Sequence, residues 1–192
     1  MTKNKLLNIA IVICKAVKIA YILTFIATTY LFINVQTNDY KEVFLNFNSI
    51  TDKSNSVLPF HYTFVDKWKE DTSLKDEEIY TTDKATTFSL YIIYLKYILI
   101  LLLTYLCINE FQKIIQTTKK YNPFLKNNIK SFRSIGKYLI VYFITTSVSI
   151  TYYQDGGFSK ISLSIGSITL IIVSFILAEI FKEGNKLQQE NE

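Results

Sequence analysis

The stretch FSLYIIYLKYILILLLTYLCI, residues 88–108, contains a single charged side chain, Lys96. A helix that crosses the hydrocarbon core of a bilayer, which is about 30 Å thick, needs about 20 mostly apolar residues. This stretch therefore predicts a transmembrane helix. Hydrophobic residues make up 49% of the 192-residue chain, a share that soluble domains can also reach, so the inference rests on how the apolar residues are grouped.

Three further blocks contain no charged side chain: residues 19–35 (IAYILTFIATTYLFINV), 138–153 (YLIVYFITTSVSITYY) and 161–178 (ISLSIGSITLIIVSFILA). Each predicts another transmembrane helix. The block at 138–153 is short, so we expect its helix to begin upstream, near Ser134. The blocks do not show the alternation typical of a transmembrane β-barrel, and we interpret all of them as helices.

Basic residues are concentrated before the first block and between the second and third blocks. They are Lys3, Lys5, Lys15, Lys18, Lys113, Lys119, Lys120, Lys126, Lys130, Arg133 and Lys137. The positive-inside rule places both regions in the cytoplasm and the more acidic segment 36–87 outside. We therefore predict a multi-pass protein of the bacterial cytoplasmic (inner) membrane with both termini in the cytoplasm. The net charge of +5 then indicates contact with anionic lipids, not direct binding of nucleic acid.

The outer segment 36–87 is too long for a simple loop. Two stretches in it alternate apolar with other residues, as half-buried strands do. They are Val43, Leu45 and Phe47 in the first stretch, and Phe60, Tyr62 and Phe64 in the second. The turn-like sequence TDKSNS separates them, so we expect a small extracytoplasmic β element.

Residues 122–137 predict a different kind of helix. Asn122 is a suitable N-cap, and Pro123 fits the first helical position. Two stripes follow with a helical period: an apolar stripe of Leu125, Ile129, Phe132 and Gly136, and a basic stripe of Lys126, Lys130, Arg133 and Lys137. This pattern predicts an amphipathic helix in the membrane interface, with its bases toward the lipid headgroups.

These segments together predict an all-α membrane protein. It is a four-helix transmembrane bundle with a cytoplasmic interfacial amphipathic helix and a small extracytoplasmic β element. We divide the chain into a cytoplasmic N-terminus with transmembrane helix 1 (1–35), an extracytoplasmic segment (36–87), transmembrane helix 2 with a cytoplasmic extension (88–118), a basic interfacial helix (119–137), transmembrane helix 3 (138–153), an outer turn (154–160), transmembrane helix 4 (161–181) and a cytoplasmic tail (182–192).

Polar side chains near or within the spans are the candidates for special roles. Lys96, an intramembrane charge, is either functional or extends outward, where Asp155 is a candidate partner. Glu179, at the inner end of the last span, is expected to pair with Arg133. Three tyrosines either line a polar cavity or bond between helices, and the second interpretation is the simpler one: Tyr91, Tyr94 and Tyr97.

Catalytic chemistry finds little support in the sequence. His61 is the only histidine, which excludes a metal site with several histidines. The chain has no Gly-x-Ser-x-Gly elbow, no Cys-x-x-Cys pair and no phosphate-binding glycine loop. We therefore expect no enzyme activity, no catalytic residue, no metal and no cofactor.

Two motifs carry a resemblance to a known family. The first is Asn122-Pro123-Phe124 followed by Asn128, Arg133, Ile135 and Gly136, and the second is AEIFKEGNKL at residues 178–187, which includes Glu179, Phe181, Gly184 and Leu187. They resemble the signatures of an uncharacterised bacterial membrane family, classed as a domain of unknown function. The resemblance implies four spans, no known catalysis and frequent encoding beside a small Cro-like helix-turn-helix regulator. The chain departs from the family in carrying Asn127 where a carboxylate is frequent.

Two functional hypotheses follow. The first is a non-enzymatic inner-membrane protein that anchors or controls a small DNA-binding regulator, with the motif residues forming the docking surface. The alternative is a small transporter or an immunity-type protein against a membrane-active peptide, with Lys96, Tyr94 and Asp155 along its path. Both hypotheses leave the oligomeric state open.

Overall fold

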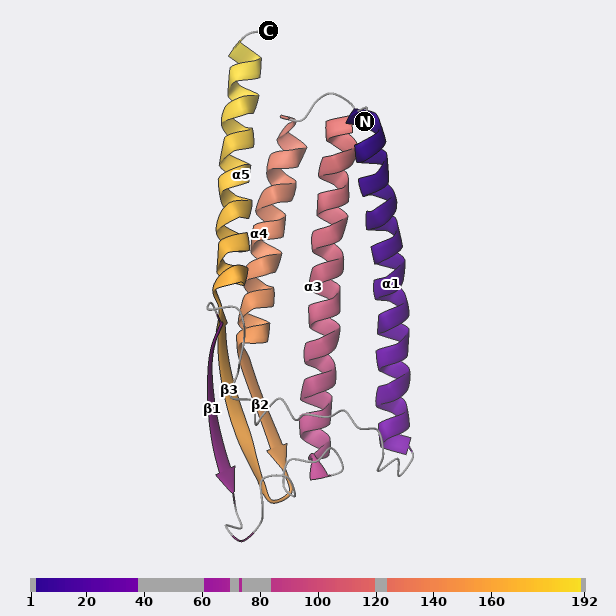
Figure 1. The fold of residues 1–192 in the computed structure, drawn as a ribbon, viewed down its shortest axis with the longest axis vertical. Coiled ribbons are helices and arrows are strands. Elements are labelled where there is room, and N and C mark those ends of the chain that lie inside the picture. Colours follow the sequence, from indigo (N-terminus) through magenta and orange to yellow (C-terminus); the bar gives the residue numbers. More distant parts are fainter. Residues whose placement is uncertain (1–2, 38–60, 70–72, 74–83, 120–123, 191–192) are drawn as a thin grey trace. The chain divides into compact units, whose positions relative to one another are not determined.

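The computed structural model describes residues 3–37, 61–69, 73, 84–119 and 124–190 (Figure 1). The helices in these ranges are α1 (Lys3–Thr37), α3 (Thr87–Lys119), α4 (Lys126–Ser147) and α5 (Ile165–Glu190). The strands are β1 (His61–Lys69), β2 (Val148–Tyr153) and β3 (Gly156–Ser164), and they form one antiparallel sheet.

The chain divides into two compact units that share the long helices. The helical unit takes Met1–Phe25, Ile100–Phe143 and Gly166–Glu192, and the sheet unit takes Ile26–Leu99 and Ile144–Ile165. Each unit has a buried cluster of its own. These clusters are Ile114, Phe132 and Ala178 in the helical unit, and Tyr153 with Phe158 in the sheet unit.

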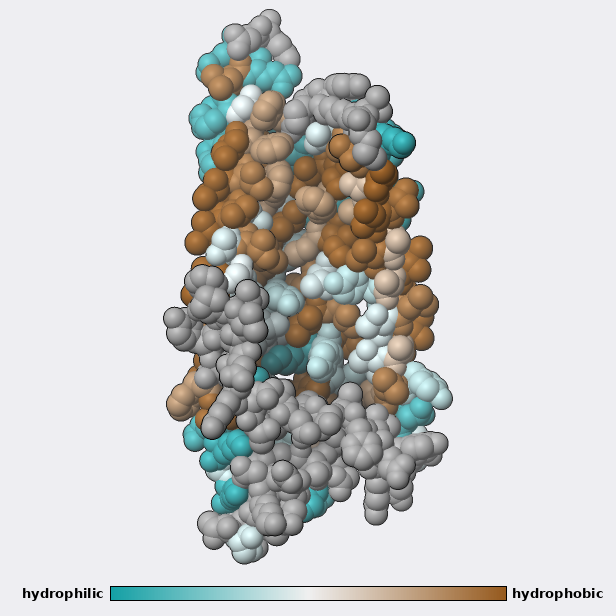
Figure 2. Space-filling view, viewed as in Figure 1, coloured by the Kyte–Doolittle hydropathy of each residue, from teal (hydrophilic) through white to brown (hydrophobic). Residues whose placement is uncertain are grey.

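Three of the described helices are long and apolar enough to cross a membrane: α1 over Lys5–Thr37, α3 and α5. Only 6%, 6% and 11% of their most apolar parts is buried, so their apolar side chains face outward. Figure 2 shows hydrophobic residues over the visible sides of α1 and α5. Such a surface suits a bilayer, because an exposed apolar area of this extent is unfavourable in water.

The shorter helix α4 differs, since the four bases of the basic stripe lie between Lys126 and Lys137. Of the four predicted spans, only the three that correspond to α1, α3 and α5 are supported by the length and composition of the described helices. The described part of the chain is mostly helical and includes a small sheet, as predicted.

In the helical unit, α4 is one continuous helix that packs against α3 and α5. Phe132 is buried with Ile114 and Ala178, and Gly136 lies against the ring of Phe175. The predicted boundary at residue 137, between an interfacial helix and a separate span, does not coincide with a helix end, because α4 runs without a break from Lys126 to Ser147. Apolar side chains of α4 find apolar partners on two neighbouring helices, which favours one uninterrupted packed helix.

The start of α4 also differs from the prediction. Phe124 and Leu125 precede the helix, which begins at Lys126, and the backbone N of Asn128 donates a 2.8 Å hydrogen bond to the carbonyl of Leu125. A helix that starts at Pro123 is therefore wrong. Asn122 and Pro123 themselves lie outside the described residues.

The sheet has the strand order β1-β3-β2. β2 and β3 form a hairpin with residues 154–155 as its turn, and Gly156, which follows the turn, has a φ of 154° that other residues rarely adopt. The backbone N of Thr86 donates a 3.1 Å hydrogen bond to the carbonyl of Tyr152. This contact joins the outer edge of β2 to the start of α3.

Residues 148–153 and 156–164 form strands where the sequence predicted parts of transmembrane helices 3 and 4. The signal was present, because Val148, Ile150 and Tyr152 alternate with Ser149 and Thr151. Alternation on both sides of the turn at residues 154–155, which Gly156 follows, favours a hairpin together with the many β-branched and aromatic residues. A hydropathy average hides this pattern, since it counts apolar residues without regard to their period.

The small β element predicted from the outer segment is confirmed in part. The expected strand around residues 60–64 corresponds to β1. The other expected strand, with Val43, Leu45 and Phe47, lies outside the described residues. β1 pairs with β3, so the sheet joins segments that lie about a hundred positions apart in the sequence.

Candidate functional site

The two sequence motifs meet in the helical unit, where the residues before α4 pack against the end of α5. The ring of Phe124 lies over Gly184, where a Cβ atom would come within 2.5 Å of the ring. Asn185 Nδ2 donates a 2.6 Å hydrogen bond to the carbonyl oxygen of Phe124. Phe181 packs beside Phe124 and Phe132, with ring centroids 5.5 and 4.9 Å away. Gly184 is therefore required by a close contact between the motifs.

An ion pair joins α4 to α5 farther along the two helices. Arg133 Nη2 lies 2.6 Å from Glu179 Oε1, and Lys182 Nζ lies 2.8 Å from Oε2 of the same carboxylate. The predicted pairing of Arg133 with Glu179 is confirmed. Both side chains of this pair are about half exposed, so the pair contributes to the orientation of the helices more than to their stability.

The remaining motif residues differ in exposure. Asn128 is only 1% exposed, and at Gly136 a Cβ atom would come within 2.8 Å of the Phe175 ring. Leu187, in contrast, is 60% exposed. Most of the described motif residues thus hold α4 on α5, a role that the sequence analysis assigned only to Arg133 and Glu179.

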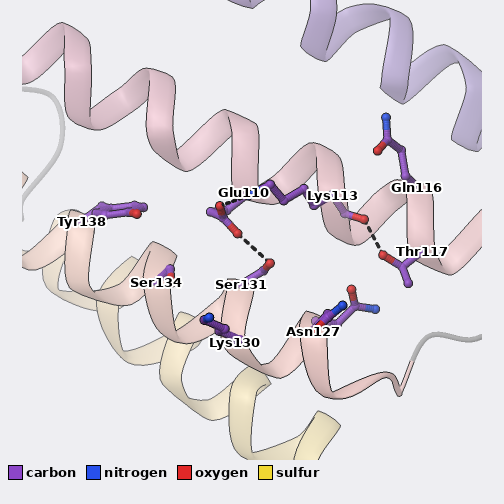
Figure 3. Close-up of a pocket in the computed structure, with 10 residues that line it drawn as sticks. Glu110, Lys113, Gln116, Thr117, Asn127, Lys130, Ser131, Ser134 and Tyr138 are labelled. Carbon is purple, nitrogen blue, oxygen red and sulfur yellow. Dashed lines mark hydrogen bonds and ion pairs between the residues drawn. The ribbon is translucent and has the colours of Figure 1, made fainter.

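A polar groove of about 580 Å³ lies between α3 and α4 in the helical unit (Figure 3). Ser131 Oγ donates a 2.7 Å hydrogen bond to Glu110 Oε2, and Lys113 Nζ donates to Oε1 of the same carboxylate. Figure 3 shows the Glu110 and Ser131 side chains pointing toward each other from α3 and α4. The groove is lined by Glu110, Lys113, Gln116, Thr117, Asn127, Asn128, Lys130, Ser131, Ser134 and Tyr138.

The sequence analysis did not single out Glu110 as a site residue. The sequence did distinguish Glu110, because it is the sole acidic residue among residues 88–137. An ammonium group and a hydroxyl group donate to its carboxylate, which favours the ionised form. The groove therefore presents one anchored negative charge among lysines, amides and hydroxyls.

The groove offers polar and charged groups for binding. The Ser131 hydroxyl donates to a carboxylate that Lys113 also contacts. No group of three or more His, Cys, Asp or Glu side chains that could hold a metal ion occurs within the described parts of the chain. The groove can contribute hydrogen bonds and charge to a polar partner.

The basic stripe is exposed along its whole length. Its residues Lys126, Lys130, Arg133 and Lys137 all lie on the surface of α4. Lys130 also lines the groove, and Arg133 belongs to the ion pair with Glu179. The positive charges of Lys126, Lys130 and Lys137 are therefore presented beside the polar groove.

In the sheet unit, Lys96 has a partner that the sequence did not suggest. Its Nζ donates a 2.8 Å hydrogen bond to the carbonyl oxygen of Val148. Asp155, the expected partner, lies 3.6 Å from Lys84 instead. The pairing of Lys96 with Asp155 is therefore wrong, because the hairpin turn carries Asp155 to the start of α3, whereas Lys96 lies beside the start of β2.

The tyrosines of α3 bond between helices, as the simpler interpretation proposed. The hydroxyl of Tyr94 lies 3.1 Å from Thr29 Oγ1, and the hydroxyl of Tyr91 donates a 3.2 Å hydrogen bond to Gln36 Oε1. Phe32 stacks on Tyr94 with ring centroids 4.1 Å apart. Tyr97 is exposed. These contacts hold the second half of α1 against the first half of α3.

No curated protein and no solved structure matches the chain. Residues 76–192 match the family described as "Protein of unknown function (DUF2975)". The matched region contains α3, α4, the β2–β3 hairpin and α5, and the match confirms the resemblance to a domain-of-unknown-function family. Because it covers more than half of the chain, the protein belongs to the DUF2975 family.

Proposed function

We propose that this protein crosses the bacterial cytoplasmic membrane four times, with both termini in the cytoplasm, and anchors or controls a small helix-turn-helix regulator. No catalysis is part of this function. The observation that carries the proposal is the exposed row of Lys126, Lys130 and Lys137 beside the polar groove. Such a surface is complementary to an acidic face on a soluble protein. The kind of partner follows from the family resemblance.

Support for a fourth crossing comes from the antiparallel pairing of α4 and α5. As the residue number rises from Phe124 to Val148, the number of the contacted residue falls from 184 to 161. The contacts are Phe124 with Gly184, Arg133 with Glu179 and Gly136 with Phe175 in the helical unit, and Val148 with Ile161 in the sheet unit. A helix that accompanies α5 in this way passes through the same depths of the membrane. α4 then crosses with α5, and its basic first half lies on the cytoplasmic side.

The three exposed lysines of α4 lie at different distances from its apolar half. Lys137 adjoins that half, whereas Lys130 and Lys126 lie about 10 and 16 Å farther along the helix axis at 1.5 Å per residue. Lys137 is therefore placed for anionic headgroups, whose attraction falls off within about a Debye length. Lys126 and Lys130 are placed for a soluble partner.

The test is co-purification from the native cells in a mild detergent. We expect the tagged protein to bring down a soluble DNA-binding protein in stoichiometric amount, and the variant Lys126→Gln with Lys130→Gln to lose it. The matched control is Lys5→Gln with Lys15→Gln, which removes the same charge from exposed positions of α1 and should retain the partner. Equal loss in both variants, or no stoichiometric partner at all, would contradict the proposal.

The alternative of transport or peptide immunity has less support. It relied on Lys96, Tyr94 and Asp155 as the lining of a path. These side chains interact with Val148, Thr29 and Lys84, respectively. Each of these three side chains therefore links two structural elements, and the regulator proposal is preferred.

A further inference from the structure

One face of the sheet is mostly apolar and is exposed. Side chains two positions apart in a strand share a face, and the strand register brings the apolar ones together: Val148 and Phe64 flank Ile161, while Tyr152 and Trp68 flank Gly157. All of these side chains, with Ile150 and Leu163, are between 37% and 66% exposed. The apolar residues of this surface, called the apolar sheet face below, are Phe64, Trp68, Val148, Ile150, Tyr152, Ile161 and Leu163. Asp66 and Ser159 lie on the same face, between the level of Val148 and the level of Tyr152.

The opposite face already holds the core of the sheet. Tyr153 and Phe158 are each 5% exposed and pack with Val65 and Ala85. Lys67 follows Val65 on this same face by the two-residue period of a strand. The apolar sheet face is therefore a second apolar surface that the core of the sheet unit does not cover.

Two contacts fix how β2 runs along α3. At one end, the rings of Tyr152 and Phe88 lie 6.5 Å apart between centroids. At the other end, Lys96 donates to the carbonyl of Val148. The eight residues from 88 to 96 cover about 12 Å of helix, and the four from 148 to 152 cover about 13 Å of strand. β2 thus accompanies the first 12 Å of the apolar segment that begins at Phe88.

The chemistry along the apolar sheet face changes with distance from the helices. Aliphatic Val148 and Ile161 lie at the level of Lys96, within the apolar segment of α3. Trp68 and Tyr152 lie at the level of Phe88, where that segment begins, and their rings meet edge to face at 5.9 Å across Gly157. A Cβ atom at Gly157 would collide with the Trp68 ring. Aliphatic residues at depth with Trp and Tyr at the end are typical of a bilayer boundary.

The edge of β2 that lies along α3 has partners for its backbone. Backbone groups inside a bilayer need partners within the protein, and α3 supplies two, because Lys96 donates to Val148 O and Ser89 Oγ accepts from Tyr152 N.

We propose that the apolar sheet face is embedded in the outer leaflet of the bilayer, with Val148 and Ile161 against acyl chains and Trp68 and Tyr152 at the headgroup boundary. The inference rests on the membrane insertion in the proposed function and is independent of the regulator. The occupant of this face is lipid because, within the sheet unit, β2 runs along the exposed apolar start of α3.

Trp68 is the sole tryptophan of the chain, so its fluorescence tests the proposal without a label. The full-length protein is reconstituted in phosphatidylcholine vesicles, with chains brominated either near the headgroup or near the terminal methyl. We expect strong quenching by the shallow bromines, several-fold weaker quenching by the deep bromines, and little quenching by aqueous acrylamide. The control, Trp68→Phe with Lys67→Trp, moves the ring to the opposite face and should lose most of the bromolipid quenching.

The outcomes separate the two claims. Protein that leaves the vesicles in an alkaline wash would overturn membrane insertion, and with it the proposed function. Protein that resists the wash but whose Trp68 is quenched by acrylamide and not by bromolipids would overturn only the lipid contact. Resistance of Trp68 to both quenchers would also overturn it, because another protein surface, such as a second copy, would then cover the face. Wild-type protein alone decides these outcomes if the control variant does not fold.

Discussion

Lys96 Nζ donates a 2.8 Å hydrogen bond to the carbonyl oxygen of Val148, the first residue of β2. Val148 directly follows Ser147, the last residue of α4. The ammonium group therefore lies at the C-terminal end of α4, where a cation is favourable and where carbonyl groups lack partners in the helix. The single charge in the apolar segment 88–108 thus has a structural role at the junction between a helix and a strand.

Removing this ammonium group should weaken the junction. We expect Lys96→Met to lower the free energy of unfolding by on the order of 1–3 kcal/mol, because the Val148 carbonyl loses a charged donor. Lys96→Arg retains a donor and should lose less. Thermal unfolding of the purified variants in detergent, followed by circular dichroism, measures the difference. A Met variant as stable as the wild type would show that the hydrogen bond contributes nothing.

Ser89 links α3 to β2. It is fully buried, and its Oγ accepts a 2.7 Å hydrogen bond from the backbone N of Tyr152. Ser89→Ala should destabilise the protein by about 1–3 kcal/mol, because a buried N–H group is left without an acceptor. The exposed Thr87→Ala, two residues earlier, is the control and should change stability far less. Chemical denaturation read from Trp68 fluorescence, which reports on the adjacent sheet, distinguishes the two.

The Arg133–Glu179 ion pair predicts a charge-reversal experiment. Arg133→Glu and Glu179→Arg should each lower the melting temperature, because each places like charges together on α4 and α5. Combining the two changes should restore part of the loss. The recovery is incomplete, since Lys182 also contacts Glu179 and would then face an arginine. A double variant no more stable than the worse single variant would mean that the pairing is not formed.

Gly184 should not tolerate a methyl group. Gly184→Ala places a Cβ atom within 2.5 Å of the Phe124 ring, and overpacking of this kind typically costs about 1–3 kcal/mol. The control is Gly166→Ala in the same helix, at an exposed position, where alanine should be neutral or stabilising because of its higher helix propensity. Adding Phe124→Leu to Gly184→Ala should recover stability. If both glycine variants unfold at the same temperature, the close contact is absent.

The expectations that held are those that depend on local composition. The three apolar helices were predictable because a long uncharged run suits a bilayer whatever its neighbours are. The pairing of Arg133 with Glu179 followed from their positions at the same ends of adjacent helices. The strands of residues 148–164 were missed because the prediction used the average hydropathy of each block. The sequence nevertheless shows apolar and polar residues alternating with a period of two on both sides of the turn at residues 154–155.

Other features could not be read from the chain, because they depend on which distant segments meet. Asn122–Lys137 showed two stripes, yet only packing against α3 and α5 decides that the apolar stripe is buried and that the helix continues to Ser147. The groove around Glu110 exists because α4 places Ser131 opposite it. The motif glycines are explained only once the rings of Phe124 and Phe175 are seen on the facing elements.

The sequence by itself determined that this protein is built from long apolar helices, that its bases gather in two regions and that Arg133 and Glu179 are partners. These are properties of composition and of position along the chain. Only the tertiary structure decided that β1 completes a sheet with the hairpin, that Lys96 binds Val148 and that the motifs bind each other. Strand pairing and side-chain contact depend on segments far apart in sequence, whose encounter no local pattern specifies.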